Sequence, residues 1–199
     1  MSIRINGVDK PSTLESKTSQ PMSTYHLAAN PNLYEIQRKN NFDFVVTDID
    51  GIVGTTGTSY PNAQEILRIA VSQSAVPHFS QNIIELKRGN NTLKYAGTPE
   101  FDETSFVFRD FIGASAKEVL LAWQSKSYNT TTQKVGLVED YKKDCYLCEY
   151  SPDYQLVRKW KMHGCWISDL KEGDYNSDDN EKQEITARIT YDWAELDAS

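Results

Sequence analysis

The chain has 199 residues, a formal net charge of −7 and 39% hydrophobic residues, a composition typical of a soluble globular protein. No apolar run approaches the roughly 20 residues that a membrane-spanning helix needs. The N-terminus lacks the apolar core of a signal peptide, so we expect a protein that is made and used without export. The acidic balance argues against a surface built to bind phosphate backbones.

The start of the chain is predicted to be an extended arm that leads into one β-rich domain. Residues 1–29 are rich in Ser, Thr and Pro and have no periodicity, as in segments that only a partner orders. We assign residues 30–199 to a single domain. It opens with strands over 32–37 and 42–46, and a Gly- and Thr-rich loop over 47–62 follows.

The segment 65–71 fits two structures. Asn62 followed three residues later by Glu65 is typical of a helix N-terminus. Apolar residues at every second position favour a strand instead, which is the structure we predict. These alternating residues are Leu67, Ile69 and Val71.

A β-hairpin is predicted next. Its strands, 83–86 and 92–96, flank a turn that contains Gly89 and Asn90, and both residue types tolerate the positive φ of tight hairpin turns. A further strand is predicted over 105–111.

One helix is strongly indicated within residues 115–128. Ser115 and Glu118 form a capping box, which places the helix over about 116–127. Its apolar face is formed by Val119, Leu120 and Trp123. A polar turn over 129–134 leads away from it.

The C-terminal part holds three runs with strand character, 141–150, 156–167 and 184–193. The first two are joined by a short turn and predict an antiparallel hairpin. An acidic loop over 169–183 separates the second run from the third. In the second run one face is formed by Leu156, Trp160, Met162 and Trp166. In the third, strict alternation predicts a buried face of Ile185, Ala187, Ile189, Tyr191 and Trp193. Together these elements predict a mainly β, antiparallel fold with one α-helix.

A phosphatase-like motif lies between residues 44 and 55. An apolar strand followed by Asp48-Ile49-Asp50-Gly51 resembles the first motif of haloacid-dehalogenase-type phosphatases, in which the two aspartates act as nucleophile and general acid beside Mg²⁺. That family requires a parallel sheet with alternating helices, which this chain does not offer. Two aspartates and a glycine that end a strand are the simpler interpretation.

Three cysteines and a histidine have spacings that could suit Zn²⁺: Cys145, Cys148, His163 and Cys165. Residues three apart on a strand point to opposite faces, however, so Cys145 and Cys148 should not converge. Reduced, buried thiols are the simpler interpretation, because an odd number of cysteines is not a disulfide framework.

The acidic loop resembles the start of a calcium-binding loop through Asp174, Asn176, Asp178, Asp179 and Glu181. The glycine and the terminal glutamate that such a loop requires are missing, so a solvated loop is favoured. We therefore predict no catalytic residue, no cofactor and no metal site.

Several segments resemble the tail tube proteins of large contractile-tailed bacteriophages. The matching stretches are Asn30-Pro31-Asn32-Leu33-Tyr34, Leu93-Lys94-Tyr95-Ala96-Gly97, Phe101-Asp102, Ala122-Trp123-Gln124-Ser125, Glu139-Asp140-Tyr141-Lys142-Lys143, Gly164-Cys165-Trp166 and Tyr191-Asp192-Trp193. The longer N-terminal arm and the 47–62 insertion depart from the family pattern.

The resemblance implies an antiparallel two-sheet β-sandwich or barrel flanked by a helix. It also implies hexameric rings in which strands of neighbouring subunits join into one continuous β-barrel channel. Stacked rings would form the hollow inner tube through which a phage delivers its genome.

The implied partners are further copies of the chain, a contractile sheath protein, and baseplate and tail-terminator proteins. A tape-measure protein and then genomic DNA would occupy the channel, and the location would be the virion tail, assembled in the bacterial cytoplasm. The alternatives are a tube-initiating baseplate protein or the effector tube of a phage-like injection or secretion system.

Overall fold

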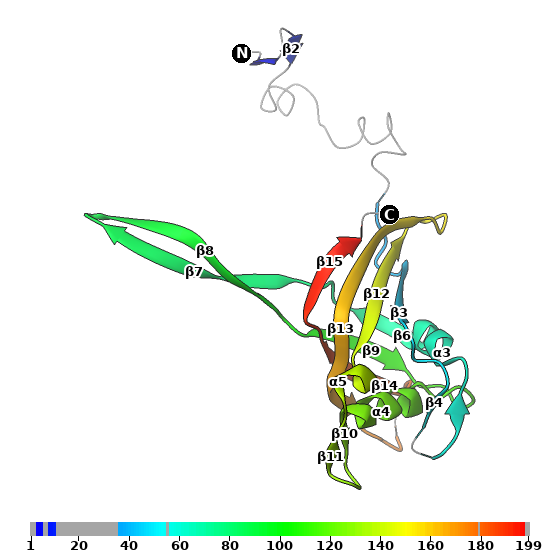
Figure 1. The fold of residues 1–199 in the computed structure, drawn as a ribbon. Helices are drawn as coiled ribbons and strands as arrows, with labels where there is room; N and C mark the ends of the chain where they lie inside the picture. Colours follow the sequence, from blue (N-terminus) through cyan, green and yellow to red (C-terminus); the bar gives the residue numbers. More distant parts are fainter. Residues whose placement is uncertain (1–2, 6–7, 11–35, 55, 179, 198–199) are drawn as a thin grey trace. The chain divides into compact units, whose positions relative to one another are not determined.

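The computed structural model describes residues 3–5, 8–10, 36–54, 56–178 and 180–197 (Figure 1). The chain divides into two units, Met1–Arg38 and Lys39–Ser199. In the first unit β1 (Ile3–Ile5) and β2 (Val8–Lys10) pair antiparallel. The rest of the predicted arm and most of the strand predicted over 32–37 lie outside the described residues.

The second unit is built on one antiparallel sheet of seven strands. Six follow one another in the order β3-β12-β13-β14-β9-β6, and β15 pairs with β13 beside them. Their bounds are Phe42–Val46 for β3, Val71–Ser74 for β6, Thr104–Arg109 for β9, Lys143–Tyr150 for β12, Leu156–Glu172 for β13, Glu184–Thr190 for β14 and Trp193–Asp197 for β15. The predicted mainly β, antiparallel class is confirmed, and so is the hairpin of the first two C-terminal runs.

The strand β13 changes partners at Gly164. Before this residue it pairs with β15, and after it with β14. Gly164 has a φ of +64°, and the pairing with β12 shifts register at the same place, which is the geometry of a β-bulge. Before the bulge the even-numbered residue Met162 is buried. After it the buried side chains are the odd-numbered Cys165 and Ile167, because the extra residue reverses which positions face the core. The prediction that Met162 and Trp166 share one face is therefore wrong.

The core lies inside the curved sheet. Phe44 on β3 meets Phe106 and Phe108 on β9, with ring centroids 4.2 Å and 6.1 Å apart. All three rings are fully buried. Because β3 and β9 are far apart in the strand order, this contact shows that the sheet curves over its own apolar face.

The predicted helix is confirmed as α4 (Ala116–Ser127). The Ser115 hydroxyl oxygen accepts a hydrogen bond from the Glu118 backbone N–H at 3.2 Å, which caps the helix. The predicted apolar face packs against β13, and Trp123 is buried with its Nε1 donating to the Tyr141 carbonyl at 2.8 Å.

The segment predicted as a strand over 65–71 is instead the helix α3 (Ala63–Ala70), which leads directly into β6. Ala63, Leu67 and Ala70 are buried at helical spacing, whereas Ile69 is exposed. The alternation of three apolar residues was misleading because only Leu67 among them is buried in the core. The prediction of a single helix is likewise wrong, since α3, α4 and the one-turn α5 (Val138–Tyr141) are all present.

The third C-terminal run is two strands rather than one. β14 ends at Thr190 and the chain turns before β15 starts at Trp193. The alternation holds as far as Tyr191, but Trp193 is 43% exposed and is not part of the core.

Strands occupy part of three segments that were predicted as loops or turns. The 47–62 loop holds the pair β4 (Ile52–Val53) and β5 (Ser59–Tyr60). The 129–134 turn is bordered by β10 (Tyr128–Asn129) and β11 (Lys134–Val135). The acidic loop predicted to start at 169 starts later, because β13 continues to Glu172.

The sheet is open within one chain. Among the described strands, β3 and β6 end the strand order without pairing with each other, and β15 pairs with β13 alone. The resemblance implied a two-sheet β-sandwich or a barrel, whereas the main sheet of the described chain is one open sheet of seven strands.

The aromatic core contact gives a test of this packing. We expect Phe106→Ala to lower the free energy of unfolding by about 3–5 kcal/mol, because it leaves a cavity between β3 and β9. The measurement is urea unfolding followed by circular dichroism. Val135→Ala, at a side chain that is 77% exposed, is the control and should change stability by less than about 0.5 kcal/mol. Equal effects of the two changes would contradict the described core.

Candidate assembly interface

A long β-hairpin leaves the sheet as a two-stranded ribbon (Figure 1). β7 (Phe79–Arg88) pairs antiparallel with β8 (Asn91–Phe101) along their whole length. Every residue of β7 is exposed, and no further strand of the described chain pairs with either edge. This confirms the predicted hairpin and extends it by four or five residues at its base in each strand.

The turn at the tip follows from local sequence. Arg88 pairs with Asn91, so Gly89 and Asn90 form a two-residue loop, and Gly89 has a φ of +62°. Positive φ at the first loop position is what a tight hairpin turn requires and what glycine adopts without strain.

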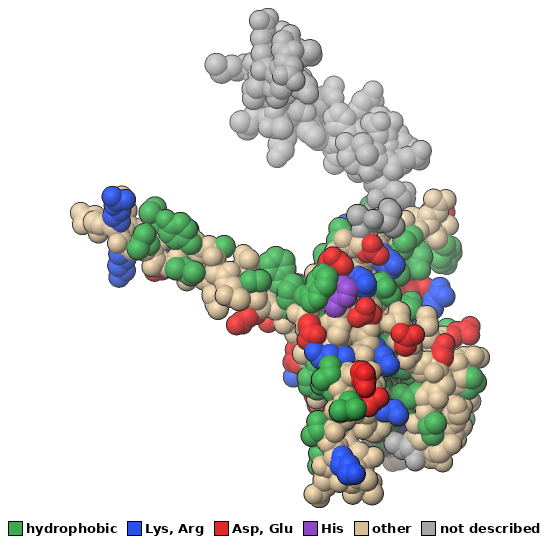
Figure 2. Space-filling view, in the orientation of Figure 1, with side chains coloured by type: hydrophobic (Ala, Val, Ile, Leu, Met, Phe, Trp, Pro, Cys, Tyr) green, Lys and Arg blue, Asp and Glu red, His purple; other side chains and the backbone are tan. Residues whose placement is uncertain are grey.

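One face of the hairpin is apolar. Directly paired residues share a face, and the pairs Ile84–Tyr95 and Leu86–Leu93 lie on the same one. We call Ile84, Leu86, Leu93 and Tyr95 the apolar hairpin face. Their exposed fractions are 57%, 51%, 46% and 53%, respectively. Figure 2 shows hydrophobic side chains along the ribbon and basic ones at its tip.

The opposite face is more polar. Glu85 and Lys94 are paired on it, with their charged atoms 3.8 Å apart, and Lys87 lies opposite Thr92. The ribbon is therefore amphipathic, although its apolar face does not pack on the core of the described chain. Sequence reasoning found the hairpin but not this surface. The available signal was the alternation of Ile84 with Leu86 and of Leu93 with Tyr95.

The base of the hairpin is held firmly. The Tyr191 hydroxyl accepts from the His78 backbone N–H and donates to the His78 carbonyl, each at 3.3 Å. The ring of Phe101 lies 6.0 Å from that of Tyr191 and 5.5 Å from that of Phe79. These contacts anchor the ribbon to the core.

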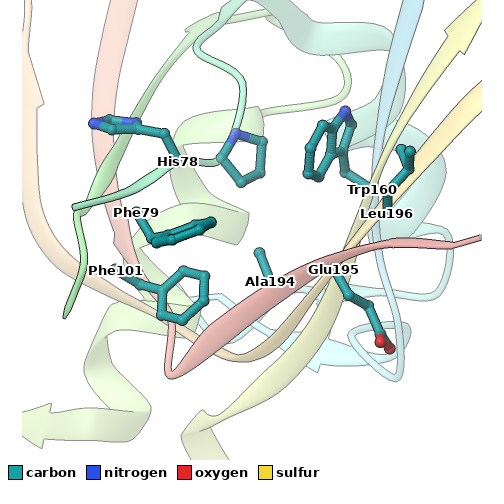
Figure 3. A pocket seen from close by; sticks show the side chains of 8 residues that line it. His78, Phe79, Phe101, Trp160, Ala194, Glu195 and Leu196 are labelled. Carbon is teal, nitrogen blue, oxygen red and sulfur yellow. The ribbon is translucent and has the colours of Figure 1, made fainter. Parts of the chain in front are cut away.

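A groove of about 400 Å³ lies at this base, beside β15 (Figure 3). We call it the basal groove. Its walls combine aromatic and aliphatic side chains with one carboxylate, and they are formed by Pro77, His78, Phe79, Phe101, Trp160, Ala194, Glu195 and Leu196. Phe79 and Leu196 remain 56% and 49% exposed, so the groove opens to solvent through apolar side chains.

The aspartates of the phosphatase-like motif do not lie in the surroundings that a phosphatase site of that type requires. Asp48 and Asp50 line a cleft of about 260 Å³ together with two lysines and two further carboxylates. One carboxylate oxygen of Asp50 accepts from the Gln64 N–H at 2.9 Å and thus caps the start of α3. The strand before them, β3, lies at the edge of an antiparallel sheet, so the parallel-sheet context of that phosphatase family is missing.

Of the four residues considered for Zn²⁺, Cys145 and Cys165 lie in contact, but the four do not come together as a metal-binding group. Burial raises the pKa of the Cys145 thiol well above its ordinary value, and contact with Cys165 adds to the shift. Burial also raises the pKa of Cys148. His163 stacks on Trp193 at a centroid distance of 3.8 Å, with Nδ1 3.5 Å from Asp144 and Nε2 3.2 Å from Glu195. All three cysteines are free thiols in buried positions.

The calcium-like segment is an exposed loop. Asn176 accepts from the Asp178 backbone N–H at 3.1 Å, and Asp174 is exposed; Asp179 lies outside the described residues. Among the residues that the structure describes, no three His, Cys, Asp or Glu side chains are grouped so as to hold a metal ion. In the same part of the chain no helix has the length and apolar character needed to cross a membrane.

No protein-family model and no curated protein matches the sequence. Solved structures do resemble the fold. A chain of the PVC sheath–tube complex of an extracellular contractile injection system aligns with a TM-score of 0.59 and 16% identity, over 89% of this chain and 99% of that one. The tube-terminating cap of the anti-feeding prophage aligns with a TM-score of 0.58 and 13% identity, over 82% and 92%.

The structure of the PVC sheath/tube terminator also contains a similar chain, with a TM-score of 0.55, 17% identity and coverage of 83% and 98%. At these identities the likeness is one of fold. The chain thus has a fold that contractile injection systems use, over nearly its whole length.

Proposed function

We propose that the chain is a structural subunit of the hollow inner tube of a contractile tail. The observation that carries this proposal is the apolar hairpin face. A two-stranded ribbon is at best marginally stable alone in water, and its four apolar side chains are about half exposed. A partner that covers this face would stabilise both the ribbon and the assembly. The proposed role involves no catalysis.

The open sheet supports assembly with further copies. Unpaired edges at β3, β6 and β15 offer backbone groups that neighbouring strands can satisfy. Identical subunits that meet head to tail form rings when the rotation closes. A hexameric ring with one continuous β-barrel channel, as the tail-tube resemblance implies, uses the edges in this way. Stacked rings then make the tube.

The proposed partners follow from the similar structures. Those are named as parts of a sheath–tube complex, a tube-terminating cap and a sheath/tube terminator. By analogy, we assign this chain a surrounding sheath, a terminator and a baseplate as partners. A tube-initiating baseplate protein is the alternative role within the same apparatus.

The proposed setting is the virion tail of a contractile phage, assembled in the host cytoplasm. There the channel would hold a tape-measure protein and later genomic DNA. The net charge of −7 supports a conduit for DNA, because a negative wall repels phosphate and lets the strand slide. An effector tube of an injection system shares the fold, and analysis of the channel contents of purified particles would separate the two settings.

Assembly is directly testable. We expect the purified chain to form rings or hollow tubes of uniform diameter in negative-stain electron microscopy, because its described residues leave the sheet edges and the apolar ribbon uncovered. Sedimentation velocity across protein and salt concentrations provides the second measurement. A monomer under every condition would contradict the proposal.

The ribbon itself is tested by Leu86→Asp combined with Leu93→Asp. Burying a leucine contributes about 1.5–3 kcal/mol, and each 1.4 kcal/mol is a tenfold change in affinity. We therefore expect the concentration needed for assembly to rise at least about tenfold, with unchanged circular dichroism in the sheet region. Glu85→Gln, on the opposite face, is the matched control and should assemble normally. Normal assembly of the double variant would exclude the apolar face from the interface.

A further inference from the structure

We propose that the apolar hairpin face of one copy docks in the basal groove of a second copy, with the ribbon edge lying along β15. This inference rests on the proposed assembly function and specifies which surfaces meet. It pairs two apolar surfaces that the described part of a single chain leaves open, the ribbon face and the groove at its base.

The ribbon cannot fill its own groove. Phe79 and Phe101 form the base pair of the hairpin and also line the groove. Ile84, the innermost residue of the apolar face on β7, is five residues farther out, about 17 Å at 3.3 Å per residue. Reaching back would require breaking the β7–β8 ladder. The described part of the chain leaves the groove open, and a second copy is the occupant that we propose.

The length of the ribbon suits a neighbouring copy. Ten residues of β7 extend about 33 Å. A compact domain of about 160 residues has a radius of gyration near 15 Å. A ribbon of this length therefore extends far enough to lie across an adjacent subunit. Ribbon and groove are different surfaces, so the contact is head to tail and continues from copy to copy.

Backbone chemistry supports the same arrangement. β15 pairs with β13 on one side, and no described strand pairs with its other side. Three residues of β15, Ala194, Glu195 and Leu196, line the groove. A strand added to such an edge gains main-chain hydrogen bonds and sends every second side chain to one face. Leu86 and Ile84 on β7, and Leu93 and Tyr95 on β8, have this spacing. They would meet the walls formed by Trp160 and Leu196.

Charge also favours this docking. Lys87 and Arg88 lie at the ribbon tip, and neither forms an ion pair within the described part of the chain. Acidic side chains lie at and beside the groove: Glu195, 3.2 Å from His163, and Asp102, 3.3 Å from His78. A lysine or arginine from a second copy would form a charge-assisted hydrogen bond with these carboxylates.

Cross-linking between two single-cysteine variants tests the contact. Leu86→Cys and Leu196→Cys are made separately in the full chain, mixed under assembly conditions and treated with a short bis-maleimide. Both positions are about half exposed, whereas the three native cysteines are buried and should not react. We expect a covalent dimer as the major product of the mixture, but not of either variant alone. Leu86→Cys mixed with Ile69→Cys, an exposed position on α3, is the control pair and should give only background dimer.

A charge exchange gives an independent measurement. Arg88→Glu should weaken assembly, and Glu195→Arg in the same chain should restore it. Circular dichroism of each variant verifies that the sheet is intact.

The outcomes separate this inference from the proposed function. Rings or tubes that form without the Leu86–Leu196 cross-link would overturn the docking and leave the tube function standing. Failure of the unmodified chain to assemble at all would overturn both. Equal cross-linking to the groove and to α3 would also contradict the inference, because it would reflect random collision.

Discussion

The bulge at Gly164 is the constraint on which the rest of the structure depends. It lets one strand, β13, pair with β15 on one half and with β14 on the other, so that a single sheet curves enough to bring Phe44 against Phe106. A side chain at this position would need positive φ and would meet the carboxylate of Asp192. The same bulge leaves β15 as a separate short strand with a free edge. Core formation and the proposed docking surface therefore have one geometric cause.

Stability and assembly are divided between different parts of this unit. The core is closed by aromatic contacts and by α4, whereas nothing in the described part of the chain adds a second layer to the ribbon or pairs with its edges. What connects them is Tyr191, which is buried with β14's apolar face and holds His78 at the root of the ribbon by two hydrogen bonds. These contacts fix the direction of the ribbon before a partner binds, which reduces the loss of conformational entropy on docking.

Strong periodicity and local caps were the parts of the fold that the sequence could predict. Ser115 and Glu118 placed α4, and Ile185, Ala187 and Ile189 placed the buried face of β14. The errors arose where a tertiary contact decides the outcome. Three alternating residues in 65–71 could not show that Ala63 and Ala70 would be buried, and the sequence near Trp193 could not show that stacking on His163 would turn it away from the core. The bulge was equally hidden, because nothing in the sequence states that Gly164 adopts positive φ.

The candidate interface was harder to foresee than the core for a physical reason. Alternating apolar residues in a strand are normally explained by burial within the same chain, so Leu86 and Leu93 carry no sequence mark that distinguishes an internal face from an external one. Only the spatial arrangement shows that nothing in the described chain covers them. The sequence motifs that resemble catalytic sites caused the opposite error, because they suggested a function where the structure shows a structural role. Asp50 resembles a catalytic acid in sequence but caps the start of α3. The residues that carry the proposed assembly are therefore apolar side chains that the described chain leaves exposed to solvent.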